Sequence, residues 1–370
     1  MNTKLLSPLV TRFLLVIMLC LPVWGSQVSA QTPESYAVLD ETTGTLTFRH
    51  DAKKPAGAYP LNSPEELPGW FAEGEDEDIV NKNRIEKVVF DASFAAARPT
   101  SCRCWFVGCT ELKTIEGIEY LNTENVVTMK SMFAFCNNLT ALDVSNFNTK
   151  NMTDMNSMFY ECNNLTTLNV SNFDTQNVTN MGWMFYGCNN ITTLNVSNFD
   201  TKKVTNMKSM FAFCNNLTTL NVTNFDTKNV TDMYAMFYEC NNLTTLNVSN
   251  FDTKNVTDMT QMFHGCNNLT TIYVSEKFVT TACEYGDEMF KDCGKLVGAV
   301  PFDENKTGME MANYTTGYFT DIKTTGISAT PISDNIAAKY YDVQGRRMDA
   351  PQKGINIVKR GGRTMKVLMK

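Results

Sequence analysis

The sequence predicts a β/α solenoid, a right-handed leucine-rich-repeat-like coil of 26-residue units, and three observations support this fold class. First, a Met-Phe pair followed by Cys-Asn-Asn recurs at a strict interval in six clear copies. Second, the hydrophobic pattern within one unit changes from a period of two to spacings of three and four. Third, degenerate copies flank the regular ones. Such irregularity is expected because an end coil lacks a neighbour on one side.

The cysteines mark the repeat most clearly, because they stand 26 residues apart in all six regular units. They are Cys136, Cys162, Cys188, Cys214, Cys240 and Cys266. A longer period is also visible, since the two residues before each of these cysteines read Ala-Phe, Tyr-Glu, Tyr-Gly and then Ala-Phe, Tyr-Glu, His-Gly. Three units, or 78 residues, therefore look duplicated together. An array that changes its length by recombination suits a surface display protein better than an enzyme.

Each unit is predicted to contain one strand and one helical segment. Leu168 and Val170 alternate with polar neighbours, which is typical of a half-buried strand. The apolar residues that follow at spacings of three and four predict a short amphipathic helix: Val178, Met181, Met184, Phe185 and Cys188. A single unit cannot bury both apolar faces alone, so stacking of neighbours must create the core. With strands about 4.8 Å apart, about eight units would extend roughly 40 Å.

Composition narrows the class of protein further. The chain has 370 residues, of which 43% are hydrophobic and 19% charged, as in a globular protein. Its formal net charge of −7 argues against a nucleic-acid partner, because phosphate binding needs a concentrated basic surface.

The first thirty residues are predicted to be an export signal. Lys4 and Arg12 supply a positive start, residues 13–21 an apolar run too short to span a bilayer, and Ala30 ends a small-residue cleavage site. Lipid attachment at Cys20 is the alternative, but the residue before it is Leu19, where a small residue is usual. No later stretch is apolar enough to cross a membrane. The mature chain is therefore expected outside the cell or on its surface, with no transmembrane span.

The remaining sequence divides into four predicted regions. Residues 31–104 form a β-rich N-terminal cap, with a hairpin-like stretch over 39–48, and residues 105–293 form the solenoid. Residues 294–335 are rich in Thr, Gly and Ala and are predicted to be a linker. Residues 336–370 are predicted to form a small C-terminal β segment.

The repeated unit resembles the BspA-like leucine-rich-repeat surface proteins of bacteria, in particular the subfamily with Met-Phe in its unit. The resemblance covers about residues 88–293. The segments from Tyr340 to Arg347 and from Gly354 to Val358 are similar to short C-terminal sorting signals of exported Bacteroidetes proteins, some of which the type IX secretion machinery reads. The resemblance implies surface exposure, an export machinery as partner and, in some members, adhesion to host matrix proteins or other bacteria. It supplies no catalytic motif.

The six repeated cysteines are predicted to pack in the core as small apolar groups. In-register side chains point the same way, so a disulfide between them would need distortion. Five cysteines outside this column are expected to pair with one another in an oxidising compartment: Cys102, Cys104, Cys109, Cys283 and Cys293.

No metal or cofactor is expected. Cys102 and Cys104 have no histidine near them in sequence, whereas tetrahedral zinc takes four ligands. A repeated aspartate supplies one carboxylate per coil, short of the six to eight oxygens that Ca²⁺ takes, and turn hydrogen bonding explains it. Its members are Asp174, Asp200, Asp226 and Asp252.

The candidate binding residues are those that vary while the scaffold stays fixed. They are Trp183, Tyr234, Tyr160, Tyr186 and Tyr238, because aromatic residues with a polar tip are favoured at binding surfaces. Packing against the neighbouring coil is the alternative for these side chains. A column of asparagines, Asn169, Asn195, Asn221 and Asn247, with Asp143 before and Tyr273 after, is predicted to be a hydrogen-bonded ladder without a ligand.

The sequence does not predict an enzyme. It has only two histidines, His50 and His264, and no nucleophile-elbow, zinc-protease or phosphate-loop motif. We expect a cell-surface protein whose solenoid binds a protein or glycan of a host matrix or of another cell. The alternatives are a structural spacer that holds another part off the surface and a secreted hydrolase.

Overall fold

The computed structural model describes residues 31–71, 82–325, 339–341, 346–348, 354–360 and 363–369. The predicted export signal and its cleavage site at Ala30 lie outside the described residues, as do residues 326–335 of the predicted linker. Within the described part of the chain, no helix has the length and apolarity needed to span a bilayer.

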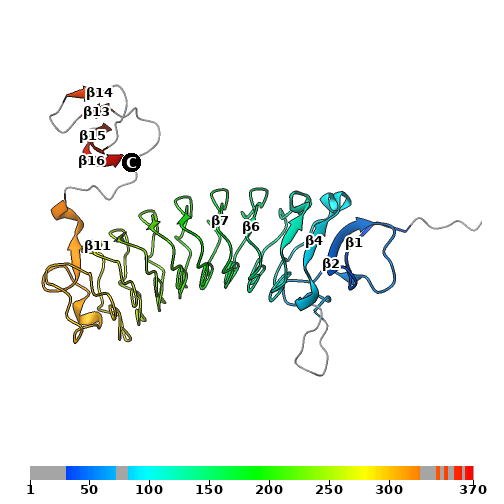
Figure 1. Ribbon diagram of the computed structural model, residues 1–370, viewed down its shortest axis with the longest axis horizontal. Helices are drawn as coiled ribbons and strands as arrows, with labels where there is room; N and C mark the ends of the chain where they lie inside the picture. The colour runs from blue at the N-terminus through cyan, green and yellow to red at the C-terminus, as the bar shows by residue number, and fades with distance from the viewer. Residues whose placement is uncertain are drawn as a thin grey trace, which may run out of the picture.

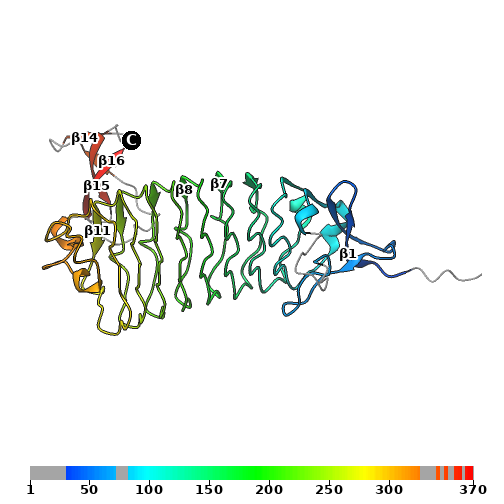
Figure 2. The ribbon, with the colours of Figure 1, turned by 60° about the horizontal axis from the view of Figure 1, so that its bottom comes forward.

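Residues from about 100 to 300 form a row of similar coils stacked side by side (Figures 1 and 2). Each coil contributes one short strand to the same side of the row: β5 (Thr114–Glu116), β6 (Ala141–Leu142), β7 (Thr167–Leu168), β8 (Thr193–Leu194), β9 (Thr219–Leu220), β10 (Thr245–Asn247) and β11 (Thr271–Val274). β6 pairs with β7, β8 with β9 and β10 with β11. All three pairs are parallel and join residues 26 apart, such as Leu142 and Leu168. Equivalent residues therefore lie in columns. We propose to class this arrangement as a solenoid of the leucine-rich-repeat type, with a cross-section that differs from the predicted one.

The cross-section differs because the coils lack the predicted amphipathic helix, so that prediction was wrong. Among the described residues there is no α-helix. The helices there are short 3-10 turns: η2 (Lys82–Arg84), η3 (Ala92–Ala96), η4 (Ile118–Tyr120), η5 (Met309–Met311) and η6 (Ile322–Thr325). The segment 129–136 and its equivalents instead form consecutive turns in which the N–H groups alternate between two kinds of partner.

In the coil that contains Phe133, every second N–H donates to a carbonyl of the next coil. The N–H of Phe133 reaches Met158 O at 3.0 Å, and that of Ser131 reaches Asn156 O at 2.9 Å. The intervening N–H groups donate three residues back, as from Met132 to Met129 O at 3.0 Å. In an α-helix the N–H groups donate to carbonyls of the same helix, so they could not donate to a neighbouring coil. A train of turns also buries residues at spacings of three and four, so the sequence pattern alone did not distinguish the two.

The alternation requires a left-handed backbone at two positions in each coil. Ser131 and Phe135 have φ of 54° and 62°, and their equivalents in the next two coils include Glu161 at 56° and Gly187 at 70°. A non-glycine residue in this region costs about 1–2 kcal/mol. The inter-coil hydrogen bonds that this conformation makes possible offset the cost.

This geometry gives a physical reason for the 78-residue period. A Cβ added to Gly187 would lie 3.0 Å from Cδ of Glu161 in the preceding coil, and one added to Gly265 would lie 2.7 Å from Cδ of Glu239. The glutamate of one coil and the glycine of the next therefore pack closely in both three-coil blocks. Phe135 begins the block, and its ring packs 5.0 Å from that of Tyr160.

Polar side chains tie the coils together at two further corners. Buried Thr201 donates from Oγ1 to Asp226 O at 3.0 Å and accepts from Asp226 N at 2.8 Å. At the turn that precedes each strand, asparagine amides bond from coil to coil, as from Asn189 Nδ2 to Asn163 Oδ1 at 3.1 Å. Each coil is thus bonded to its neighbour through side chains as well as through the backbone.

The N-terminal region continues the sheet beyond the first coil. β1 (Glu34–Asp40) and β2 (Thr45–Asp51) confirm the predicted hairpin, and β2 pairs in parallel with β4 (Lys87–Phe90), which pairs with β5. β3 (Tyr59–Pro60) lies at the outer edge. Under this sheet the ring of Phe48 stacks on Trp105 at 5.0 Å, and the indole of Trp70 donates to Trp105 O at 2.9 Å. These residues cover the apolar end of the first coil.

Residues 294–325 are not the loose connection that their Thr- and Gly-rich composition predicted. β12 (Phe319–Asp321) pairs in parallel with β11, and Tyr318, Phe319 and Leu296 are buried. The adjacent aromatic residues Tyr318 and Phe319 anchor the segment on the last coil, and two residues do not stand out in the overall composition. Farther on, β13 (Lys339–Tyr341), β14 (Arg347–Met348), β15 (Gly354–Arg360) and β16 (Arg363–Met369) form an antiparallel sheet in the order β14-β13-β15-β16.

Replacing Thr201 with valine tests the threonine column. The change leaves the N–H and C=O of Asp226 without their partner, so we expect a loss of about 1–3 kcal/mol of unfolding free energy. Urea unfolding followed by circular dichroism measures it. Thr205→Val is the control, because Thr205 is exposed and its hydroxyl donates only to Thr179 O, at 3.3 Å. Equal midpoints for both variants would contradict the assigned role.

Replacing Gly187 with alanine tests the three-coil block. We expect Gly187→Ala to destabilise the protein through both the left-handed backbone and the contact with Glu161. In a Glu161→Ala background the contact with the glutamate carboxylate is absent and only that with Cα of residue 161, at 3.2 Å, is kept, so mainly the backbone cost of about 1–2 kcal/mol should remain. A double-mutant cycle by urea unfolding measures the coupling. Strict additivity of the two changes would show that the glutamate does not impose the glycine.

Candidate functional site

Two outward surfaces of the stacked coils carry the candidate residues. The first, called here the turn face, consists of the outward side chains at positions 130, 131, 134 and 135 and their equivalents in the later coils. The second, called here the strand trough, runs along β6 to β11 and is lined by 141–143, 167–169, 193–195, 219–221, 245, 247 and 273. The five predicted binding residues all lie on the turn face.

Three of these residues belong to an aromatic column on the turn face. Its rings follow one another along six coils in the order Phe135, Tyr160, Tyr186, Phe213, Tyr238 and His264, with centroids 4.5–5.1 Å apart. Tyr160 and Tyr186 are stacked at 4.5 Å and 4°. Burial, with Tyr160 and Glu161 close by, raises the pKa of Tyr186 to about 12. Burial also raises the pKa of Tyr160 and Tyr238, so the three tyrosines of the column stay neutral.

Ring stacking within the column limits what these tyrosines offer to a ligand. Tyr186 lies between Tyr160, whose ring stacks on it, and Phe213, whose ring is T-shaped to it. A ligand that stacks needs a free face, and Tyr160 already occupies one face of Tyr186. This geometry favours packing between coils, the alternative weighed for Tyr160, Tyr186 and Tyr238.

The other two predicted residues are brought together by a lysine that the sequence reasoning missed. Lys208 Nζ lies 4.4 Å from the ring centroid of Tyr234 and 5.4 Å from that of Trp183. Tyr234 also donates from its hydroxyl to Gln261 Oε1 at 3.2 Å. The sequence did contain a signal for this contact. Lys208 has the same position in its coil as Gly182 in the coil before and Tyr234 in the coil after. One cation thus lies over both the Trp183 and the Tyr234 ring.

The two histidines form no catalytic arrangement within the described residues. His50 Nδ1 lies 2.8 Å from Ser35 Oγ on the N-terminal hairpin, but among the described residues no carboxylate is hydrogen-bonded to its other ring nitrogen. His264 ends the aromatic column, with ring nitrogens 3.6 Å from Glu288 and 3.5 Å from Asp292. The described residues also hold no group of three His, Cys, Asp or Glu side chains suited to a metal ion.

The cysteine column is buried, and each thiol donates to a phenylalanine carbonyl of the coil before, as from Cys162 Sγ to Phe133 O at 3.1 Å. Cys293 makes the same contact with Phe263 O at 3.0 Å. It therefore belongs to the column, although its 27-residue offset predicted otherwise. One extra residue is absorbed in a loop without breaking the register.

The expected disulfides are not formed among the described residues. Cys102, Cys104 and Cys109 are buried and form no disulfide, and Cys283, which is partly exposed, donates to Tyr285 O at 3.0 Å. Burial raises the pKa of the thiols of Cys162 and Cys214 to about 12. The column thiols therefore stay protonated and unreactive.

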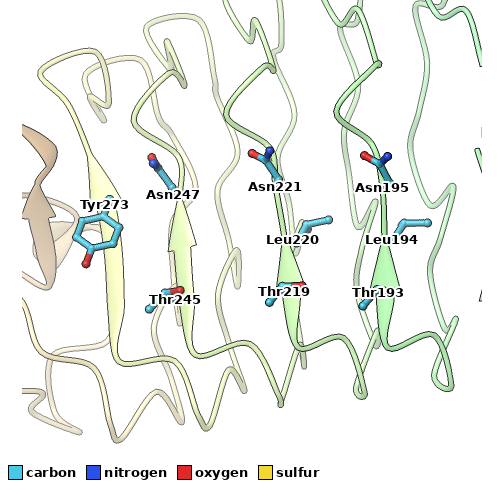
Figure 3. A pocket seen from close by; sticks show the side chains of 9 residues that line it. All are labelled: Thr193, Leu194, Asn195, Thr219, Leu220, Asn221, Thr245, Asn247 and Tyr273. Atoms are coloured by element: carbon cyan, nitrogen blue, oxygen red, sulfur yellow. The ribbon is translucent and has the colours of Figure 1, made fainter. Parts of the chain in front are cut away.

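The strand trough holds two adjoining cavities of about 450 and 440 Å³ that share Thr193. Figure 3 shows its construction: Asn195, Asn221 and Asn247 form one row, Thr193, Thr219 and Thr245 form a second, and Leu194 and Leu220 lie between them. Tyr273 replaces asparagine at the end of the row. Asp143 is the only charged side chain that lines either cavity.

The asparagines of the trough do not form the predicted ladder. Asn195 Oδ1 accepts from the N–H of Ser197 at 3.1 Å and from its hydroxyl at 2.7 Å, and Asn221 makes the same pair of bonds with Thr223. The bonds are local because the side chain closes a turn just after the strand. The coil-to-coil amide ladder lies instead at the Asn-Asn turns, as between Asn268 and Asn242 at 3.4 Å.

Together, these features define a tandem-repeat protein with a long open trough along its strands. A family model described as a Mycoplasma protein of unknown function, DUF285, matches residues 100–219 and again residues 212–320. The matches span more than half of the chain, so the chain belongs to the DUF285 family. No curated protein and no solved structure matches it. Family membership is consistent with a surface repeat protein and says nothing about a ligand.

The buried thiols predict a loss of stability at high pH. A folded thiol with a raised pKa keeps its proton while the unfolded one ionises near its ordinary value of 9.0. The stabilisation is therefore complete below about pH 9 and is lost as pH rises toward 12. The urea midpoint, measured in reducing buffer, should fall as the pH is raised from 7.5 to 10. The fall should be smaller for Cys188→Ala, and an identical fall would show that the thiols do not cause it.

Proposed function

We propose that this chain is an exported cell-surface protein whose stacked coils bind a protein or a glycan of a host matrix or of another cell. The observation that supports binding is the strand trough, in which cavities of about 450 and 440 Å³ adjoin along the strands and expose rows of asparagine and threonine side chains. A surface of this length suits an extended ligand better than a small molecule. No cofactor or metal is part of the proposal.

Export and attachment rest on the sequence. Residues 1–30 have the pattern of a cleaved signal, and the segments over 340–347 and 354–358 are similar to Bacteroidetes sorting signals, so we propose an export machinery as a second partner. The DUF285 match supports a surface repeat protein in general terms.

A structural spacer is the second candidate, and the turn face favours it. There the aromatic rings stack on one another and Lys208 covers Trp183 and Tyr234, so most of the interaction capacity of this face is used internally. A secreted hydrolase has less support, since neither histidine has a catalytic partner set among the described residues.

The test is binding of the purified full chain to immobilised matrix proteins, mucin and glycans, measured by surface plasmon resonance. Thr193→Arg with Thr245→Arg places two bulky cations in the trough, and Thr179→Arg with Thr231→Arg places them on another exposed threonine column as the control. We expect the trough variant to bind at least about tenfold more weakly and the control to bind normally. Absence of binding to any of these ligands would favour the spacer. Equal binding by both variants would move the site away from the trough.

A further inference from the structure

We propose that the strand trough binds a linear, uncharged glycan through a row of asparagine amide donors that ends at Tyr273. The inference rests on the proposed function and specifies its ligand. It depends on four observations: the atoms that the asparagines leave free, a comparison with a second column of turns, the charge of the lining, and the spacing of the row.

The asparagine side chains are held with their nitrogen free. Oδ1 of Asn195 accepts two hydrogen bonds from Ser197, and one of these comes from a backbone N–H, which can only donate. The atom that faces it must therefore be the oxygen, which fixes the orientation of the amide. Both lone pairs of that oxygen are used, so the two N–H donors of Nδ2 are what the side chain offers to a ligand. Asn169 and Asn221 are held in the same way.

The turn itself does not require an amide. A second column makes the same side-chain turn at another corner of the coil with aspartate, as where Asp226 Oδ1 accepts from Lys228 N at 3.2 Å. Each column also contains one exception of the opposite type. Asp143 closes the turn in the trough at 2.9 Å, and Asn148 closes it in the aspartate column at 3.2 Å. Since either residue serves the turn, the turn alone does not require asparagine in the trough, and the asparagines differ from aspartate in the uncharged donors that they present.

The two columns also differ in charge. In the aspartate column a lysine two residues on pairs with the carboxylate, as Lys254 does with Asp252 at 2.9 Å. The trough has serine or threonine at the corresponding position, and Asp143 is the only charged residue that lines its cavities. An anionic polymer would find no counter-charge there. Uncharged donors instead fit hydroxyl, ether and acetamido oxygens.

The spacing favours a glycan over an extended peptide. Neighbouring coils place donors about 4.8 Å apart, a step comparable to one pyranose unit, and the row from Asp143 to Tyr273 extends about 24 Å. Carbonyls on one side of an extended peptide recur roughly every 6.8 Å, so they would fall out of step within two coils. Tyr273 lies at the end of the row, and its ring packs against no other aromatic ring among the described residues. Tyr273 is half-buried and lines the cavity, where its ring can contact a sugar ring.

The test uses a matched pair of amide-to-acid substitutions in the full chain. Asn221→Asp keeps the oxygen that closes the turn and replaces the donors with a charged acceptor. Asn148→Asp makes the same change in the other column.

Affinity electrophoresis and calorimetry would use a linear β-glucan, a mannan and an N-acetylglucosamine oligomer as neutral probes, with hyaluronate as the anionic one. We expect Asn221→Asp and Tyr273→Ala to weaken binding of a neutral glycan about tenfold each. Asn148→Asp should bind normally, and all three variants should keep the wild-type urea midpoint.

The outcomes separate this inference from the proposed function. Binding of a neutral glycan that Asn221→Asp weakens and Asn148→Asp does not would support the inference. It would be overturned by preference for hyaluronate, by equal binding of Asn221→Asp and wild type, or by binding of protein ligands alone. In the last case, sensitivity to Thr193→Arg with Thr245→Arg would leave the proposed function standing while the glycan is rejected.

Discussion

The fold depends on the hydrogen bonds between consecutive coils, which join residues at a nearly fixed offset along the chain. In the turn segment every second N–H bonds to the next coil, and in the strands the pairing joins residues 26 apart. An isolated coil could satisfy neither set of backbone groups, so no coil is stable without its neighbours. This constraint explains why the offset is kept so strictly, and why the single extra residues near Cys109 and Cys293 are absorbed in loops rather than in the bonded segments.

A fixed offset brings equivalent side chains into columns, so each residue must be compatible with its own copies. Buried cysteine and threonine meet this condition because each one bonds to the backbone of a neighbouring coil. In three consecutive coils the stacked aspartates are each paired with a lysine, as in the Lys202 and Asp200 pair at 3.1 Å. Glu161 and Glu239 are each followed by a glycine in the next coil, against which the glutamate side chain packs closely.

The repeat, its strand and the burial of its apolar positions could be predicted from the sequence, because periodicity records burial directly. The path of the backbone between those positions could not. Met181, Met184, Phe185 and Cys188 have the same spacing in a helix and in a train of turns, and the deciding feature is a positive φ at Trp183 that its residue type does not suggest. The same limit applied to the candidate site. Trp183 and Tyr234 were identifiable as variable aromatic residues, but their contact with Lys208 depends on which coil lies beside which.

The turn face and the strand trough therefore differ in how many of their side-chain groups remain free to contact a ligand. This difference matters more for binding than sequence variation between the coils does. On the turn face the side chains that vary between coils contact one another. The rings of the aromatic column pack together, and Lys208 contacts the Trp183 and Tyr234 rings. In the trough the side chains hardly vary, yet each asparagine keeps two donors that no described residue occupies. Association is favourable only when new contacts replace bonds to water rather than existing bonds within the protein. A repeat protein of this kind gains affinity by adding one modest interaction per coil. A ligand with its own repeat can use such a row, which is why the uniform surface, not the varied one, is the stronger candidate.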